Sequence, residues 1–124
     1  MSEESSSRIV AVQHKWNNFL WKWLDRIQTL RFNKEYGRAL ETLFELCDFI
    51  PEEVYKEMEP MLKEAKEKFD APFDAPADPF ENIRVRRKIR ENRAQGLLGD
   101  LIRLLRATLE KRGYLEKKGG IFEE

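Results

Sequence analysis

The spacing of apolar residues constrains this chain more than any other feature. Apolar side chains recur at intervals of three and four residues almost throughout the 124 residues, and no segment shows sustained alternation of apolar and polar residues. The first pattern is typical of amphipathic helices, whereas a half-buried strand requires the second. The sequence therefore predicts an all-α protein, a compact bundle of four to five helices in a single domain over residues 1–124.

Local start signals predict where the first three helices begin. Ser7 is a suitable N-cap for a helix that runs to about Phe32, and Asn33 is a suitable cap for the second helix. Pro51, followed by two glutamates, suits the first turn of the third helix. Pro60 lies inside that helix, so we expect it to kink or divide the helix. The apolar stripe of the first helix comprises Ile9, Val12, Trp16, Leu20, Trp23, Ile27 and Leu30.

A proline-rich segment separates the third helix from the last. It contains a tandem Phe-Asp-Ala-Pro and three prolines within residues 69–80, so we expect residues 70–80 to form an extended, stiff connector. Aspartates recur there every four residues, which is a spacing that does not converge on a metal in an extended chain. Caps and turns explain Asp70, Asp74 and Asp78 better. We expect residues 1–6 to be disordered and residues 113–124 to be a frayed tail.

The last predicted helix, from about residue 82 to 112, is rich in leucine between Leu97 and Leu109. Such a short apolar face either closes the core of the bundle or zips against a second copy of the chain, which would make a homodimer. Gly96 and Gly99 disfavour helix, so they mark either a break or a close crossing of two helices.

Charge is balanced overall but not along the chain. Residues 33–83 hold 6 Lys and Arg against 14 Asp and Glu, whereas residues 84–124 hold 12 against 6. This asymmetry fits a basic binding surface, or else two halves that pair with each other. A single cysteine and a polar N-terminus without a signal peptide fit a cytoplasmic protein, and no apolar run is long enough for a membrane span. The high charge content favours a thermophilic source.

Residues for catalysis are scarce. With one histidine, His14, and one cysteine, Cys47, the chain cannot build a zinc site from His and Cys ligands, and no glycine-rich phosphate loop follows a strand. We expect no catalytic residue, no metal site and no cofactor, and therefore a protein that acts by binding.

The first candidate binding element is the aromatic run from Trp16 to Trp23, which holds all three tryptophans. Trp16 and Trp23 lie on the apolar stripe, Phe19 lies at its edge, and Trp21 points away from it. Cations follow the same edge, and single-stranded nucleic acids bind to rings bordered by cations in this way. The simpler alternative is a bulky core helix with a solvated edge. The cations are Arg8, Lys15, Lys22 and Arg26.

The second candidate is the arginine run, residues 84–93, in which six of ten residues are basic. Extending the leucine face backwards puts Arg87 and Arg90 on its apolar side, where a charge needs either a bend in the helix or a polyanionic partner. Alternatively, these arginines pair with the acidic segment Glu41–Glu67. The candidate phosphate contacts are Arg84, Arg86, Arg87, Lys88, Arg90 and Arg93, because arginine suits bidentate phosphate binding.

The layout resembles the ThermoDBP-type single-stranded DNA-binding proteins of hyperthermophilic archaea. The similar features are the aromatic run Trp16–Trp23, the arginine run and the leucine-rich segment Leu97–Leu109. The resemblance implies an aromatic and basic cleft for single strands and a C-terminal dimerising helix. It is one of layout and composition, so no residue's role is taken from it.

Two hypotheses about function follow. The first is sequence-independent binding of single-stranded DNA or RNA, with Phe19, Trp21 and Trp23 stacking on bases. The alternative is a helical protein–protein adaptor or accessory subunit that uses its aromatic and leucine stripes. Exposure of Trp21 beside the arginine run would favour the first. A third hypothesis, binding of duplex DNA, has less support, because no helix-turn-helix spacing accompanies the basic segment.

Overall fold

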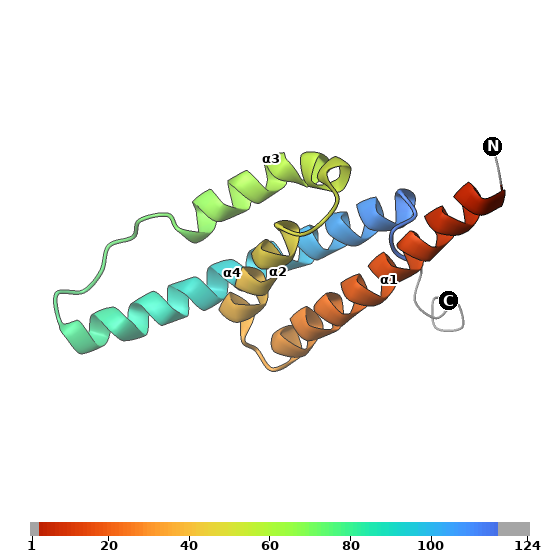
Figure 1. The fold of residues 1–124 in the computed structure, drawn as a ribbon. Helices are drawn as coiled ribbons and strands as arrows, with labels where there is room; N and C mark the ends of the chain where they lie inside the picture. Colours follow the sequence, from red (N-terminus) through yellow and green to blue (C-terminus); the bar gives the residue numbers. More distant parts are fainter. Residues whose placement is uncertain (1–2, 117–124) are drawn as a thin grey trace.

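Four α-helices account for most of the described chain (Figure 1). The computed structural model describes the backbone of residues 3–116 and the side chains of residues 15–116. The helices are α1 (Glu3–Phe32), α2 (Tyr36–Cys47), α3 (Glu52–Phe69) and α4 (Pro79–Lys111). No strand occurs within residues 3–116, so the all-α prediction is confirmed with four helices.

The core lies where α2 and α4 meet their neighbours. α1 packs against α2, while α4 packs against both α2 and α3 (Figure 1). The leucine-rich segment of α4 turns its apolar face into this core, which is the first of the two uses expected for it. The largest fully buried side chains are Leu20, Leu24, Ile27, Leu40, Leu43, Leu46, Val54, Met58, Leu98, Leu101, Leu105 and Leu109. No helix within residues 3–116 combines the length and apolar character needed to cross a membrane.

The N-terminus of α2 is capped from a distant helix rather than by a neighbour in sequence. The prediction that Asn33 is the cap is wrong, because Lys34 adopts a left-handed backbone (φ 64°) that delays the helix to Tyr36. The Glu91 carboxylate of α4 accepts hydrogen bonds from the backbone N–H of Tyr36 (2.9 Å) and Gly37 (3.2 Å). A Cβ on Gly37 would lie 2.7 Å from Glu91 Oε1, so a larger residue there would push the carboxylate away from this position.

Helices α3 and α4 are continuous where a break was expected. Pro60 lies inside α3 without dividing it. Proline has no backbone N–H, so the carbonyl of Lys56, four residues earlier, loses its usual donor. Lys56 and Pro60 are both exposed, so this carbonyl lies on the side of the helix that faces water. α4 likewise continues through Gly96 and Gly99, and a Cβ on Gly99 would approach only the flexible ends of arginine side chains.

The first turn of α4 forms earlier than predicted, at Pro79 rather than Asn82. Asp78 caps it, and its carboxylate accepts hydrogen bonds from the N–H of Phe80 (2.8 Å) and Glu81 (3.2 Å). Proline at the first helical position completes this start signal, because its missing N–H would have no partner there. Residues 70–78, between α3 and α4, contain no helix or strand and are called the connector below.

The two ends of the chain differ from expectation. α1 begins at Glu3, so residues 3–6, expected to be disordered, are helical. After α4, Gly113 adopts φ 81° and turns the chain back, so that the N–H of Glu116 donates to Asn17 Oδ1 of α1 at 2.8 Å. Residues 113–116 are therefore packed rather than frayed. Residues 117–124 lie outside the described part of the chain.

Candidate functional site

Five aromatic rings form a continuous row along α1. The row runs from Tyr114 through Trp16, Phe19 and Trp23 to Phe49, with successive ring centroids 5.9, 5.8, 6.2 and 6.3 Å apart. These spacings fall within the range of favourable aromatic pairs. Phe19 is 37% exposed and Phe49, in the turn between α2 and α3, is 59% exposed. We call these five residues the aromatic row.

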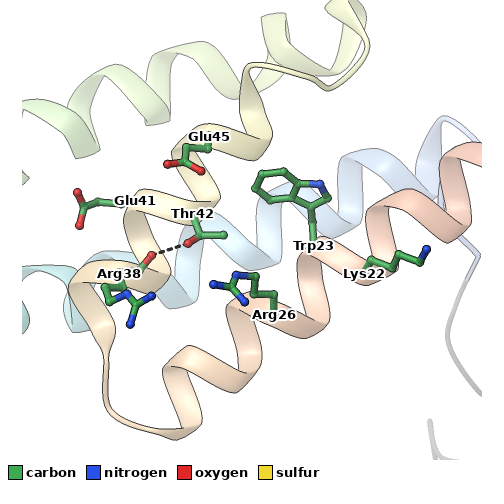
Figure 2. Close-up of a pocket in the computed structure, with 7 residues that line it drawn as sticks. All are labelled: Lys22, Trp23, Arg26, Arg38, Glu41, Thr42 and Glu45. Carbon is green, nitrogen blue, oxygen red and sulfur yellow. Dashed lines mark hydrogen bonds between the residues drawn. The ribbon is translucent and has the colours of Figure 1, made fainter.

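Basic side chains border the aromatic row on α1. Lys15, Lys22 and Arg26 are exposed, and none of them takes part in an ion pair within residues 15–116. Lys22 and Arg26 share a groove of about 510 Å³ with Trp23, between α1 and α2. Figure 2 shows Trp23 and Arg26 on the side of this groove formed by α1. The predicted combination of rings and cations is thus present in one place. Arg8, which was expected to extend the same edge, belongs to the part of α1 whose side chains are not described.

The opposite wall of the groove carries both signs of charge. Figure 2 shows Arg38, Glu41, Thr42 and Glu45 on α2. Arg38 pairs with Glu35 at 2.9 Å and Glu41 pairs with Arg90 at 3.0 Å, so Glu45 is the carboxylate of this wall without an ion pair among the described residues. A polyanion in the groove would therefore run along the α1 wall, where Lys22 and Arg26 have no acidic partner in the part of the chain whose side chains are described.

Trp21 lies apart from the aromatic row. It is half-buried against the core, and the guanidinium of Arg106 on α4 lies 5.2 Å from its ring centroid. Arg106 Nε is buried without a hydrogen-bond acceptor in the described residues, so the ring compensates part of the cost of burying this cation. The geometry gives Trp21 a packing role, whereas the sequence placed it among the stacking residues.

The arginine run, Arg84–Arg93, does not border the aromatic row. It surrounds the connector instead. The Arg93 guanidinium donates to the carbonyls of Phe69 (3.4 Å) and Ala71 (2.5 Å). Arg90 lies 4.2 Å from the centroid of the Phe69 ring, and Arg86 and Arg93 each lie 5.8 Å from that of Phe73. Arg86 and Arg93 fix the connector to α4, whereas Arg90 contacts the last residue of α3.

Pairing with the acidic segment accounts for part of the arginine run, as one of the alternatives predicted. Arg90 pairs with Glu41 at 3.0 Å, and at the far end of α4 Arg112 bonds to Glu57 at 2.6 Å. The charge of Arg90 thus needs neither a bend in α4 nor a polyanion. Arg84 pairs with Glu81 at 3.6 Å. Arg87 and Lys88 are exposed and form no ion pair with another described residue.

Sequence reasoning missed three residues of the site, namely Phe49, Tyr114 and Arg38. Phe49 lies off the apolar stripe of α2, directly before Ile50 and Pro51. A large apolar residue in that position was the available signal that its ring is exposed. Tyr114 follows the glycine that ends α4 and was assigned to the frayed tail. Only the packing of α2 on α1 brings Arg38 to the groove.

Cys47 is buried, and the acidic side chains of the described residues are dispersed. No three His, Cys, Asp or Glu side chains among them converge as a metal site. Burial raises the pKa of the Cys47 thiol to about 12, which leaves almost no thiolate at neutral pH. His14 belongs to the part of α1 whose side chains are not described. No known family model, curated protein or solved structure matches the chain.

Proposed function

We propose that the aromatic row and its bordering cations bind single-stranded nucleic acid, DNA or RNA, largely independently of base sequence. The observation that carries this proposal is that Phe19, Trp23 and Phe49 adjoin Lys15, Lys22 and Arg26, whose charges no described carboxylate engages. Every base has a π-face that can stack on an aromatic ring, whatever the sequence, while cations follow the phosphates. Each stacked base contributes about 1–3 kcal/mol.

The geometry supports a narrower site than the sequence suggested. Trp21 packs against Arg106, and Arg86 and Arg93 of the arginine run contact the connector, so the proposal assigns stacking to the aromatic row alone. The strand would follow the α1 wall of the groove, because Glu41 and Glu45 line the α2 wall. A protein with no net charge then binds with modest affinity that falls as salt rises.

Intrinsic tryptophan fluorescence during titration with oligo(dT), at two salt concentrations, tests the proposal. We expect saturable quenching that weakens at the higher salt, because Trp16 and Trp23 belong to the row. Phe49→Ala should weaken binding by about tenfold, the equivalent of 1.4 kcal/mol. It keeps all three tryptophans as reporters.

Phe32→Ala is the matched control. Phe32 is 87% exposed and lies at the other end of α1, about 20 Å from Phe19 at 1.5 Å per residue. Its loss should leave oligo(dT) affinity unchanged. Absence of quenching and of binding at low salt would rule out the nucleic-acid proposal.

One observation favours a second function, that of a protein–protein adaptor. Trp16, Phe19 and Phe49 surround a surface hollow of about 370 Å³ in which Lys15 is the single charged side chain. An apolar side chain of a partner helix would fill such a hollow. A partner held in this way would bind at high salt and be lost in Phe19→Ala and Phe49→Ala but retained in Phe32→Ala, in a pull-down that compares the three variants.

A further inference from the structure

A cleft of about 350 Å³ separates the connector from the first half of α4. Its volume lies within the range of small-molecule sites. Arg86, Arg87, Arg90 and Arg93 line it together with the rings of Phe69 and Phe73. Four guanidinium groups around one cleft are an unusual concentration of positive charge in a chain whose net charge is zero.

The aromatic rings hold these arginines without consuming their hydrogen-bond donors. Arg90 stacks on Phe69 at 4.2 Å, and Arg86 and Arg93 lie 5.8 Å from the centroid of Phe73. A ring contacts the face of a guanidinium group, whereas the N–H donors point outwards in its plane. The arginines are thus oriented while their edges remain able to bind an anion.

Counting donors shows how much capacity remains. A guanidinium group has five N–H donors. Arg86 uses Nε on Asn82, Arg90 uses Nη2 on Glu41, and Arg93 uses Nη1 on two carbonyls of residues 69 and 71. Arg87 makes no hydrogen bond or ion pair with any other described residue. Most of the donors around the cleft therefore have no acceptor among the described residues.

Charge counting leads to the same conclusion. Two carboxylates oppose the four guanidinium groups: Asp70, which lines the cleft, and Glu41, which is bound to Arg90. The remaining positive charge needs an anion with several acceptor oxygens. Phosphate matches the planar fork of arginine, which donates two parallel hydrogen bonds to it.

We propose that the cleft between the connector and α4 is a phosphate-binding site, with Arg87 as its main unengaged donor. The shared chemistry is a phosphate or diphosphate group, supplied either by a free small molecule such as a nucleotide or by the terminal phosphate of a strand. The inference does not rest on the proposed function, because the cleft and the aromatic row share no residue.

Isothermal titration calorimetry with inorganic pyrophosphate tests the site on the full chain and two variants. We expect Arg87→Gln to weaken binding at least tenfold and to leave the melting temperature of the free protein unchanged, since Arg87 has no partner to lose within residues 15–116. Arg84→Gln is the matched control, because it removes the same charge one turn away, outside the cleft. The affinity of the Arg84→Gln variant for pyrophosphate should stay within about twofold of that of the unaltered chain.

Two results would overturn the proposal. One is the absence of pyrophosphate binding up to millimolar concentration. The other is an equal loss in Arg87→Gln and Arg84→Gln, because it would mean that only overall charge matters.

Oligo(dT) with and without a 5′-phosphate distinguishes the two sources. If the strand supplies the phosphate, the 5′-phosphate tightens binding to the unaltered chain but not to Arg87→Gln. If a free molecule supplies it, pyrophosphate binds and the 5′-phosphate changes nothing. All three tryptophans lie on α1, so their fluorescence reports on the aromatic row. If pyrophosphate binds but no oligonucleotide quenches this fluorescence, the proposed function is rejected and the phosphate site stands.

Discussion

The aromatic row and the cluster around the connector contain the same kinds of residue in opposite arrangements. In the row, rings contact rings, and the neighbouring cations Lys15, Lys22 and Arg26 have no acidic partner in the described residues. At the connector, arginines stack on phenylalanines and Arg93 donates to main-chain carbonyls. Composition therefore does not separate a binding surface from a structural one. What each cation contacts separates them.

This difference has an energetic meaning. A cation that bonds to buried or half-buried acceptors stabilises the fold, because removing it leaves those acceptors without donors. An exposed cation without a partner contributes little to stability and remains available to a ligand. Replacing Arg93, which bonds to main-chain carbonyls beside the connector, should therefore lower stability, whereas replacing Lys22 or Arg26 on α1 should lower affinity.

The largest expected effect on stability is that of Arg93→Ala. It removes the donor to the carbonyls of Phe69 and Ala71, and hydrogen bonds from charged groups contribute about 1.5–3 kcal/mol. We expect a loss of that size in the free energy of unfolding, measured with urea. Arg26→Ala should change it by less than about 0.5 kcal/mol. Equal losses would abolish the distinction between the two regions.

The acidic residue inside the arginine run is expected to have the next largest effect. Glu91→Ala removes the cap of α2 and should cost about 0.5–2 kcal/mol in thermal or urea unfolding. Glu91→Gln keeps an oxygen acceptor and should lose less. Glu59→Ala, at an exposed position of α3, serves as the control. If Glu91→Ala is no worse than Glu59→Ala, the capping role is wrong.

On α1, the expected change is in salt dependence rather than stability. If Lys22 and Arg26 each contact one phosphate, replacing either with Gln should reduce the slope of log affinity against log salt by about 0.7, the value for a single strand. Oligo(dT) titrations at four or more salt concentrations measure this slope. An unchanged slope with unaltered affinity would remove these two cations from the binding surface.

The smallest expected effect is a change in pH dependence at the end of the aromatic row. The Tyr114 hydroxyl donates to the Glu53 carboxylate, and this bond raises the pKa of Tyr114 above its ordinary value of 10. The folded protein then keeps this proton longer than the unfolded chain, so the bond stabilises the fold below pH 10 and its contribution is lost as the pH rises through the higher, folded pKa.

Tyr114→Phe keeps the ring contact with Trp16 and removes the hydroxyl. Its melting temperature should therefore decline less than that of the unaltered chain between about pH 9 and 11. Identical slopes would show that the hydroxyl does not contribute. Oligo(dT) binding at neutral pH should be unaffected, which separates this bond from the function of the row.

Periodicity alone was enough to predict the helical class, and helical spacing predicted that Phe19 lies at an edge bordered by basic residues, with Trp16 and Trp23 on the apolar stripe beside it. Features that depend on distant contacts were missed. The cap from Glu91 to α2 joins residues 54 positions apart, and Phe49 reaches the row only through a turn. Pro60 did not divide α3, because local propensity yields to packing when the freed carbonyl lies on an exposed side of the helix.

The arginine run shows the same limit from another direction. The sequence placed Arg87 and Arg90 on the apolar side of the helix and offered a bend, a polyanion or the acidic segment to account for them, but none of these is the partner that the fold supplies to Arg93. That partner is the main chain of the connector, whose carbonyls have no helical donors. Sequence patterns describe side chains, so they do not reveal which main-chain carbonyls of an irregular segment will need a hydrogen-bond donor.

Glu41 links the two regions thermodynamically. Its carboxylate lines the groove beside Trp23 and also pairs with Arg90 at the connector. A ligand that takes the Nη2 edge of Arg90 must release Glu41, whose unpaired charge then adds to the negative wall of the groove. Occupancy of one site would thereby weaken a polyanion at the other, and reciprocity requires the same coupling free energy in both directions. Two surfaces on a chain of 124 residues would thus antagonise each other through one exposed carboxylate.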